Sequence, residues 1–129
     1  LIGQVVAEAS LDVPEDYLRD TYDEYVERRK CLIDGLNMIP GVYSPIPMGA
    51  FYTVAKLPVD DAEKFCAWCL SEFEYEGETV FMAPAAGFYT TPGLGVNEVR
   101  IAYVLNKSDL NRALFVLSKA LEAYPGKTE

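Results

Sequence analysis

One permanent cation stands among the β-forming residues of the stretch NEVRIAYVL, residues 97–105. Val99, Ile101 and Tyr103 suit a packed sheet, whereas the guanidinium of Arg100 keeps its charge at any physiological pH. Its planar donors match a carboxylate in a two-point contact that lysine does not reproduce. Arg100 is therefore the strongest candidate for binding chemistry in this chain.

Two kinds of partner for Arg100 are open at this point. Side chains alternate along a strand, so Glu98 shares a face with Arg100, and an ion pair with Glu98 or with a helix carboxylate would satisfy the cation. Surface pairs of that kind are common and contribute about 0 to 1 kcal/mol. The other interpretation is that Arg100 binds a substrate carboxylate, with Tyr52 and Tyr89, which follow glycine-containing turns, lining the pocket.

Other motifs are explained by packing or capping. Cys66 and Cys69 in CAWC have redox or metal-ligand spacing, but they fall inside an expected helix, on its apolar face, and no second such pair exists. We therefore expect core packing there. The adjacent Asp60 and Asp61 suit a helix start. The stretch PGLGVNE, residues 92–98, lacks a dinucleotide fingerprint and indicates a loop. No metal site and no catalytic residue is expected.

Composition narrows the class of protein. The 129 residues include 11 Lys and Arg against 20 Asp and Glu, a net charge of −9 that disfavours nucleic acid as a partner. There is no histidine, which excludes Ser-His-Asp and Cys-His machinery within this chain. Three cysteines, an odd number, indicate a reducing compartment, and we expect a cytoplasmic protein. No apolar run approaches the roughly 18 residues of a membrane span.

Hydrophobic periodicity predicts alternating helices and strands. The expected elements are a helix from Asp12 to the Pro40-Gly41 pair, a strand over 50–57, a helix from Asp60 to residue 73, strands over 78–84 and 98–105, and a helix from Asn106 or Ser108 to the Pro125-Gly126 pair. Asp12 with Glu15, and Asp60 with Glu63, have capping-box spacing. This order predicts an α+β fold, a small mixed or antiparallel sheet of about three strands packed with helices.

Residues 1–11 stand apart from this domain, which we place at residues 12–129. Leu1, Ile2, Val5 and Val6 give the segment an apolar helical face. It has the pattern of the end of an interdomain helix whose packing partner lies in missing sequence. The first residue is not Met, and we expect the chain to be a piece of a longer protein.

Three stretches, taken in order, resemble one family. YDEYVERRKCLIDGLNMIPGVYSPIPMGAFY, VFMAPAAGFY and NEVRIAYVLNKSDLNRALFVLSKALE are similar to the C-terminal small domain of fold-type I, pyridoxal-phosphate-dependent aminotransferases of the aspartate aminotransferase class. The resemblance covers about residues 11–124. It implies that Arg100 binds the α-carboxylate of an amino acid and that the domain closes over the site.

The resemblance also implies an activity for the longer protein. A full-length homodimer would transfer an amino group between an amino acid, such as aspartate, and a 2-oxo acid, using pyridoxal 5'-phosphate held by the missing large domain. The family's Schiff-base lysine stands in a Ser-x-x-Lys context that this chain lacks. The isolated chain is therefore expected to bind no cofactor and to be inactive. Where the family has Pro-Gly, this chain has Pro84-Ala85, which leaves the path of that loop open.

A second class of function shares the same pattern. A free-standing, amino-acid-binding regulatory α+β module would also use Arg100 to hold a carboxylate. The apolar face of residues 1–9 counts against it, because an independent module would not leave that face without a partner.

Overall fold

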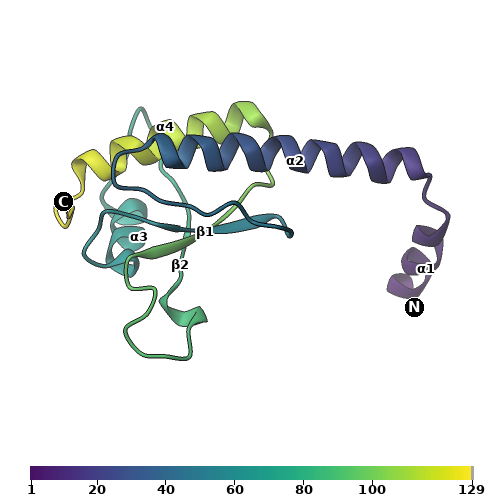
Figure 1. Cartoon of the computed structure of the whole chain (residues 1–129), viewed down its shortest axis with the longest axis horizontal. Helices are drawn as coiled ribbons and strands as arrows, with labels where there is room; N and C mark the ends of the chain where they lie inside the picture. Colours follow the sequence, from purple (N-terminus) through teal and green to yellow (C-terminus); the bar gives the residue numbers. More distant parts are fainter. Residues whose placement is uncertain (129) are drawn as a thin grey trace.

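The computed structural model describes residues 1–128, which form an α+β fold (Figure 1). In chain order the elements are α1 (Ile2–Ala9), the 3-10 turn η1 (Ser10–Asp12), α2 (Glu15–Met38), β1 (Tyr52–Lys56), α3 (Ala62–Ser71), β2 (Ala83–Pro84), the 3-10 turn η2 (Ala86–Phe88), β3 (Glu98–Ala102) and α4 (Lys107–Ala123). The predicted fold class and order of elements are confirmed.

The sheet places Arg100 at its centre. The strand order is β1-β3-β2, and both pairings are antiparallel. Arg100, in the middle of the central strand, lies opposite Val54 of β1 and Ala83 of β2. The strand expected over 78–84 is paired in the sheet only at Ala83 and Pro84. Proline lacks a backbone donor and is tolerated at such a sheet edge.

Helices cover one face of the sheet. In Figure 1, α2 and α4 run side by side above the strands, and α3 lies near one end of them. Thr53, Ala55 and Val99 point into the core, as their burial shows. The residues that alternate with them, including Arg100, are exposed or half-buried. Among the described residues, therefore, no helix covers the face that carries Arg100.

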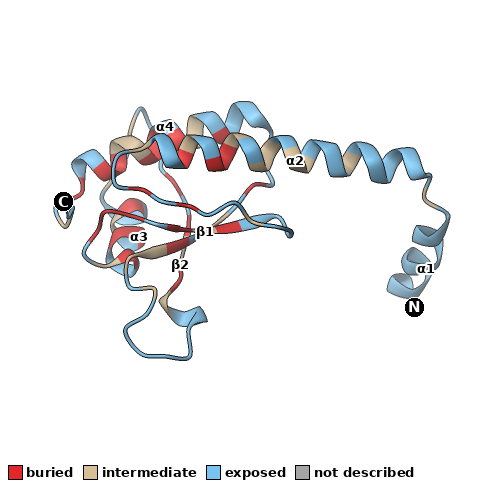
Figure 2. Ribbon diagram, viewed as in Figure 1, coloured by how far each residue is buried: buried red, intermediate tan, exposed pale blue. Residues whose placement is uncertain are grey.

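The core joins the three packed helices to the sheet. It includes Leu36 of α2, Phe65 of α3 and Leu117 of α4, and Figure 2 shows the burial concentrated where these helices meet the strands. At Gly35 the helices α2 and α4 come so close that a Cβ atom would overlap the side chain of Leu114. Close packing of this kind fixes α2 against α4.

Two predicted helix starts are wrong. Pro14, not Asp12, precedes the first turn of α2 and supplies no side-chain cap. Because the residue before a proline is driven out of the helical region, Val13 is extended (φ −65°, ψ 129°) and the helix cannot reach back to Asp12. At α3 the cap is Asp61 rather than Asp60, and its Oδ1 accepts from the backbone N–H groups of residues 63 and 64 at 2.8 and 3.2 Å.

The last helix start is as predicted, with Asn106 as the cap. Its side chain accepts from the backbone N–H of Asp109 at 2.9 Å. The residue displaced at α3, Asp60, has another role. Its carboxylate accepts a hydrogen bond from the hydroxyl of Tyr124 at 3.0 Å. This bond connects the end of α4 to the start of α3.

The N-terminal part of the chain extends away from the packed body (Figures 1 and 2). All of α1 is exposed, with Leu1 at 98% and Ile2 at 83% of full exposure. The turn at residues 10–14 separates α1 from α2. That residues 1–11 end an interdomain helix stays a prediction. No helix in the described part of the chain has both the length and the apolar character needed to cross a membrane.

Candidate functional site

Two aromatic rings flank the guanidinium of Arg100. Its Cζ lies 4.5 Å from the ring centroid of Phe88, which ends η2, and 5.2 Å from that of Tyr52, which begins β1. Both distances fall in the range of cation–π contacts. The rings limit the directions in which the guanidinium can turn. Tyr52, predicted to line a pocket, therefore lies directly beside Arg100.

Arg100 has no partner of opposite charge among the described residues. The ion pairs of this part of the chain involve other cations. The ion pair with Glu98 that the sequence left open is not formed among the described residues; Glu98 accepts a hydrogen bond from the hydroxyl of Tyr89 at 2.5 Å. A guanidinium that is exposed, unpaired and flanked by rings can bind a carboxylate from outside the chain by donating hydrogen bonds to it.

Tyr89 does not contact Arg100 in the way that Tyr52 does. It lines a separate hollow of about 240 Å³ on the same side of the sheet, together with Val54, Lys56 and Glu98. The hydrogen bond to Glu98 raises the pKa of Tyr89. The ring also fills the space beside Gly95, where an added Cβ would lie 2.5 Å from Tyr89 Cε2. Tyr89 is thus held between Glu98 and Gly95.

The loop before these aromatic residues needs no unusual backbone. Ala85 takes a right-handed conformation (φ −92°, ψ −14°), and its N–H donates to the carbonyl of Glu98 at 2.8 Å. Alanine therefore fits where the family has glycine. Phe88 was missed by sequence reasoning, which singled out its neighbour Tyr89. No local pattern distinguishes the two, because only the η2 turn directs Phe88 toward Arg100.

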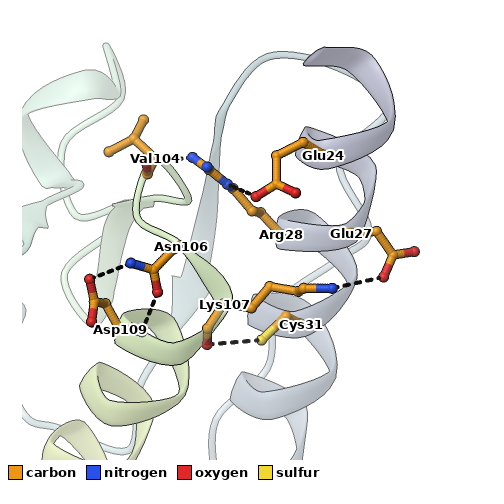
Figure 3. A network of polar contacts seen from close by, with 8 residues as sticks. All are labelled: Glu24, Glu27, Arg28, Cys31, Val104, Asn106, Lys107 and Asp109. Atoms are coloured by element: carbon orange, nitrogen blue, oxygen red, sulfur yellow. Dashed lines mark hydrogen bonds and ion pairs between the residues drawn. The ribbon is translucent and has the colours of Figure 1, made fainter. Parts of the chain in front are cut away.

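Polar contacts tie the end of β3 to α2 (Figure 3). Arg28 donates to Glu24 at 2.7 Å and to the carbonyl of Val104 at 2.6 Å. Nearby, Lys107 and Glu27 form an ion pair at 3.4 Å. These contacts fix the connection between β3 and α4, so the strand that carries Arg100 is anchored just beyond its last residue.

A second arginine of α2 holds the segment before β1. Arg29 donates to the carbonyl of Pro47 at 3.2 Å, and Tyr103 donates to the carbonyl of Ala50 at 2.8 Å. Ala50 has φ +61°, a left-handed conformation that is uncommon for a residue with a side chain. Together these bonds set the turn from which β1 and Tyr52 begin.

The cysteines behave as core residues. Cys66 and Cys69 are 7% and 0% exposed, and burial raises the pKa of their thiols to about 11 and about 12. A reactive thiol has a lowered pKa instead, so the expected packing role is confirmed. All three cysteines are free. No cluster of three or more Cys, Asp or Glu side chains in the described residues is arranged to hold a metal ion.

Several known proteins are similar to this chain in sequence or in fold. No family model matches the chain. An aspartate aminotransferase of Rhizobium meliloti is 29% identical over 131 residues, 92% of this chain and 30% of its own length. One from Pyrococcus horikoshii is 35% identical over 101 residues, 77% of this chain and 24% of its own length. The α-aminoadipate aminotransferase LysN of Thermus thermophilus superposes with a TM-score of 0.73 at 22% identity, over 91% of this chain and 29% of that protein.

The chain matches the small domain of fold-type I aminotransferases. It spans about 30% of the length of the first curated relative, and the resemblance drawn from its motifs is confirmed. The LysN structure, which establishes the shared fold alone, is a complex with N-(5'-phosphopyridoxyl)-L-leucine. An aminotransferase small domain is one part of a pyridoxal-phosphate enzyme.

Three of the six lysines of the chain are held in ion pairs. Lys30, Lys107 and Lys119 form ion pairs with carboxylates at 2.6, 3.4 and 2.8 Å. Those pairs raise the pKa of Lys30 and Lys119. A lysine that forms a Schiff base needs a lowered pKa.

Proposed function

We propose that this chain is the small domain of a pyridoxal-phosphate-dependent aminotransferase and that Arg100 binds the α-carboxylate of its amino acid and 2-oxo acid substrates. The supporting observation is the state of Arg100, which is flanked by Tyr52 and Phe88 and has no carboxylate partner among the described residues.

The place of Arg100 is more informative than its lack of an ion pair, because several other cations among the described residues also have no carboxylate partner. Acidic residues outnumber basic ones by 20 to 11, so partners for surface cations are plentiful. Arg28 pairs with Glu24, and Arg112 pairs with Glu76 and Glu78. Arg19, Arg29 and Arg100 form no ion pair among the described residues, and of these Arg100 is the one at the centre of the sheet with a ring on either side. A guanidinium held in this way is suited to a carboxylate brought in by a substrate.

The rest of the enzyme would come from outside these residues. The large domain supplies the cofactor and the Schiff-base lysine, and the cofactor serves as the electron sink for transamination. The isolated chain would then be inactive, and the full-length enzyme would act as a homodimer. The names of the sequence relatives support aspartate as the amino acid. Free, buried thiols fit a reducing compartment, so we place the enzyme in the cytoplasm.

Within this assembly the small domain orients the substrate and excludes water. Arg100 lies on the face of the sheet that no helix in residues 1–128 covers, where a large domain could close against it. Closure would desolvate the contact between guanidinium and carboxylate, which strengthens it. The anchored ends of β1 and β3 keep Arg100 in place as this happens.

Substitution of Arg100 in the complete enzyme tests the proposal. Loss of a desolvated, two-point contact costs about 2 to 5 kcal/mol, which corresponds to a fall in kcat/KM of about 30- to 5000-fold. We expect losses in this range for Arg100→Gln and smaller ones for Arg100→Lys. The matched control is Arg112→Gln, which removes a paired surface arginine and should leave kcat/KM within about threefold. Unchanged kinetics for both Arg100 variants would refute the proposal.

A further inference from the structure

A carboxylate of the chain itself, that of Glu98, lies close enough in sequence to compete with a substrate for Arg100. Glu98 precedes Arg100 by two positions on the same strand and the same face, and this spacing separates their Cα atoms by about 7 Å. Both side chains are long enough to meet over that distance. Lys56, opposite Glu98 in the β1–β3 register, is the other charged group on this face beside Glu98.

The structure keeps Glu98 and Arg100 apart through two consecutive aromatic residues. Phe88 contacts the guanidinium of Arg100 with its ring face. Tyr89 donates its hydroxyl to Oε2 of Glu98. The cation and the carboxylate are therefore each held by a neighbouring residue of one short loop, and neither contacts the other.

Tyr89 is placed for this role by the shape of the loop. Gly95, at φ +72°, lets the backbone pass directly against the ring, and a side chain there would overlap it. The ring is thereby confined on one side, while its hydroxyl reaches Glu98 nine residues further along the chain. With 41% of its surface exposed, Tyr89 adds little to the core.

We propose that Tyr89 is a positioning residue that holds the Glu98 carboxylate away from Arg100 and so keeps the guanidinium free for substrate. This inference rests on the proposed carboxylate-binding role of Arg100. Without the Tyr89 hydroxyl, Glu98 becomes a tethered competitor at high effective concentration. Because exposed ion pairs are weak, the competition raises KM by about two- to tenfold and leaves kcat within about twofold.

A set of variants in the complete enzyme, assayed with L-aspartate as amino donor, tests this inference. Tyr89→Phe removes only the hydroxyl and is expected to raise KM by about two- to tenfold. Tyr89→Phe combined with Glu98→Gln removes the competitor as well, and KM is expected to return to the wild-type value. If Tyr89 had only a structural role, changing Glu98 would not restore the wild-type KM.

The outcomes separate the inference from the proposed function. If Arg100→Gln leaves KM unchanged, the carboxylate-binding role of Arg100 is wrong, and this inference falls with it. If Arg100→Gln raises KM but Tyr89→Phe does not, only the role of Tyr89 is overturned. That role is equally overturned if the double variant keeps the raised KM. Thermal unfolding of each variant shows that the comparison is made between folded proteins.

Discussion

Alkaline titration of the buried thiols gives a quantitative test of the packing at CAWC. The ordinary thiol pKa of 9.0 is raised to about 11 for Cys66 and about 12 for Cys69, because burial disfavours the thiolate. A raised pKa means that the folded state favours the neutral thiol. The resulting stability is complete below pH 9 and is lost as the pH rises toward the folded pKa values.

The size of the loss follows from these two pKa values. At pH 10 the thiols of the unfolded chain are mostly ionised, whereas those of the folded chain remain protonated. Each pH unit between the unfolded and folded pKa costs about 1.4 kcal/mol per group. The two cysteines together should lower the free energy of unfolding by about 3 kcal/mol between pH 7 and pH 10. The whole free energy of unfolding of a small domain is only about 5 to 15 kcal/mol.

Urea unfolding at pH 7, 9 and 10 measures this loss. Combined Cys66→Ala and Cys69→Ala substitution lowers stability at every pH but should remove most of the fall between pH 7 and pH 10. Cys31→Ala, which removes a half-buried thiol, is the control. This variant should show the same fall in stability between pH 7 and pH 10 as the wild type. Tyr124, whose pKa is raised to about 12, contributes little at or below pH 10. An unchanged fall in the double variant would refute the reasoning, and so would thiol labelling of folded Cys66 as fast as that of Cys31.

Two further substitutions test local features of the fold and the site. Asp61→Ala should lower the free energy of unfolding by about 1 kcal/mol, because the cap of α3 is lost. Asp61→Asn should retain most of the stability that the cap contributes. An unchanged urea midpoint for the alanine variant would contradict the assignment of Asp61 as the cap. Phe88→Leu should raise KM in the complete enzyme by about two- to fivefold, because one cation–π contact with Arg100 is lost. Phe88→Tyr should keep the wild-type KM, and equal effects of both changes would show that the ring face is not what matters.

Periodicity predicted most of the fold because the chain follows simple local rules. The apolar stripes of α3, of α4 and of the second half of α2, and the alternation in β3, mark their buried faces. In the first half of α2 the apolar residues Leu18 and Tyr22 are exposed. The errors at the two helix starts have local causes. Pro14 forces Val13 out of the helical region and moves the start of α2. At α3 two adjacent aspartates satisfy the capping pattern, and only the folded structure selects Asp61.

The candidate site was predictable in part, for a similar reason. Arg100 was recognisable from its residue type and its place in an apolar strand. Its freedom from Glu98 depends on Tyr89, nine residues away in the chain. Its position between rings depends on Phe88, which a turn of three residues brings to the sheet. Contacts of this range are made by the loop as a whole and leave no periodic signal in the sequence.

The central claim is that Arg100 binds the α-carboxylate of the substrate. The most direct measurement is a crystal structure of the complete enzyme with an amino-acid substrate analogue bound. We expect two N–H groups of Arg100 at about 2.7 to 3.2 Å from the two oxygens of the α-carboxylate. A carboxylate bound by other residues, with Arg100 in solvent or paired with Glu98, would contradict the claim.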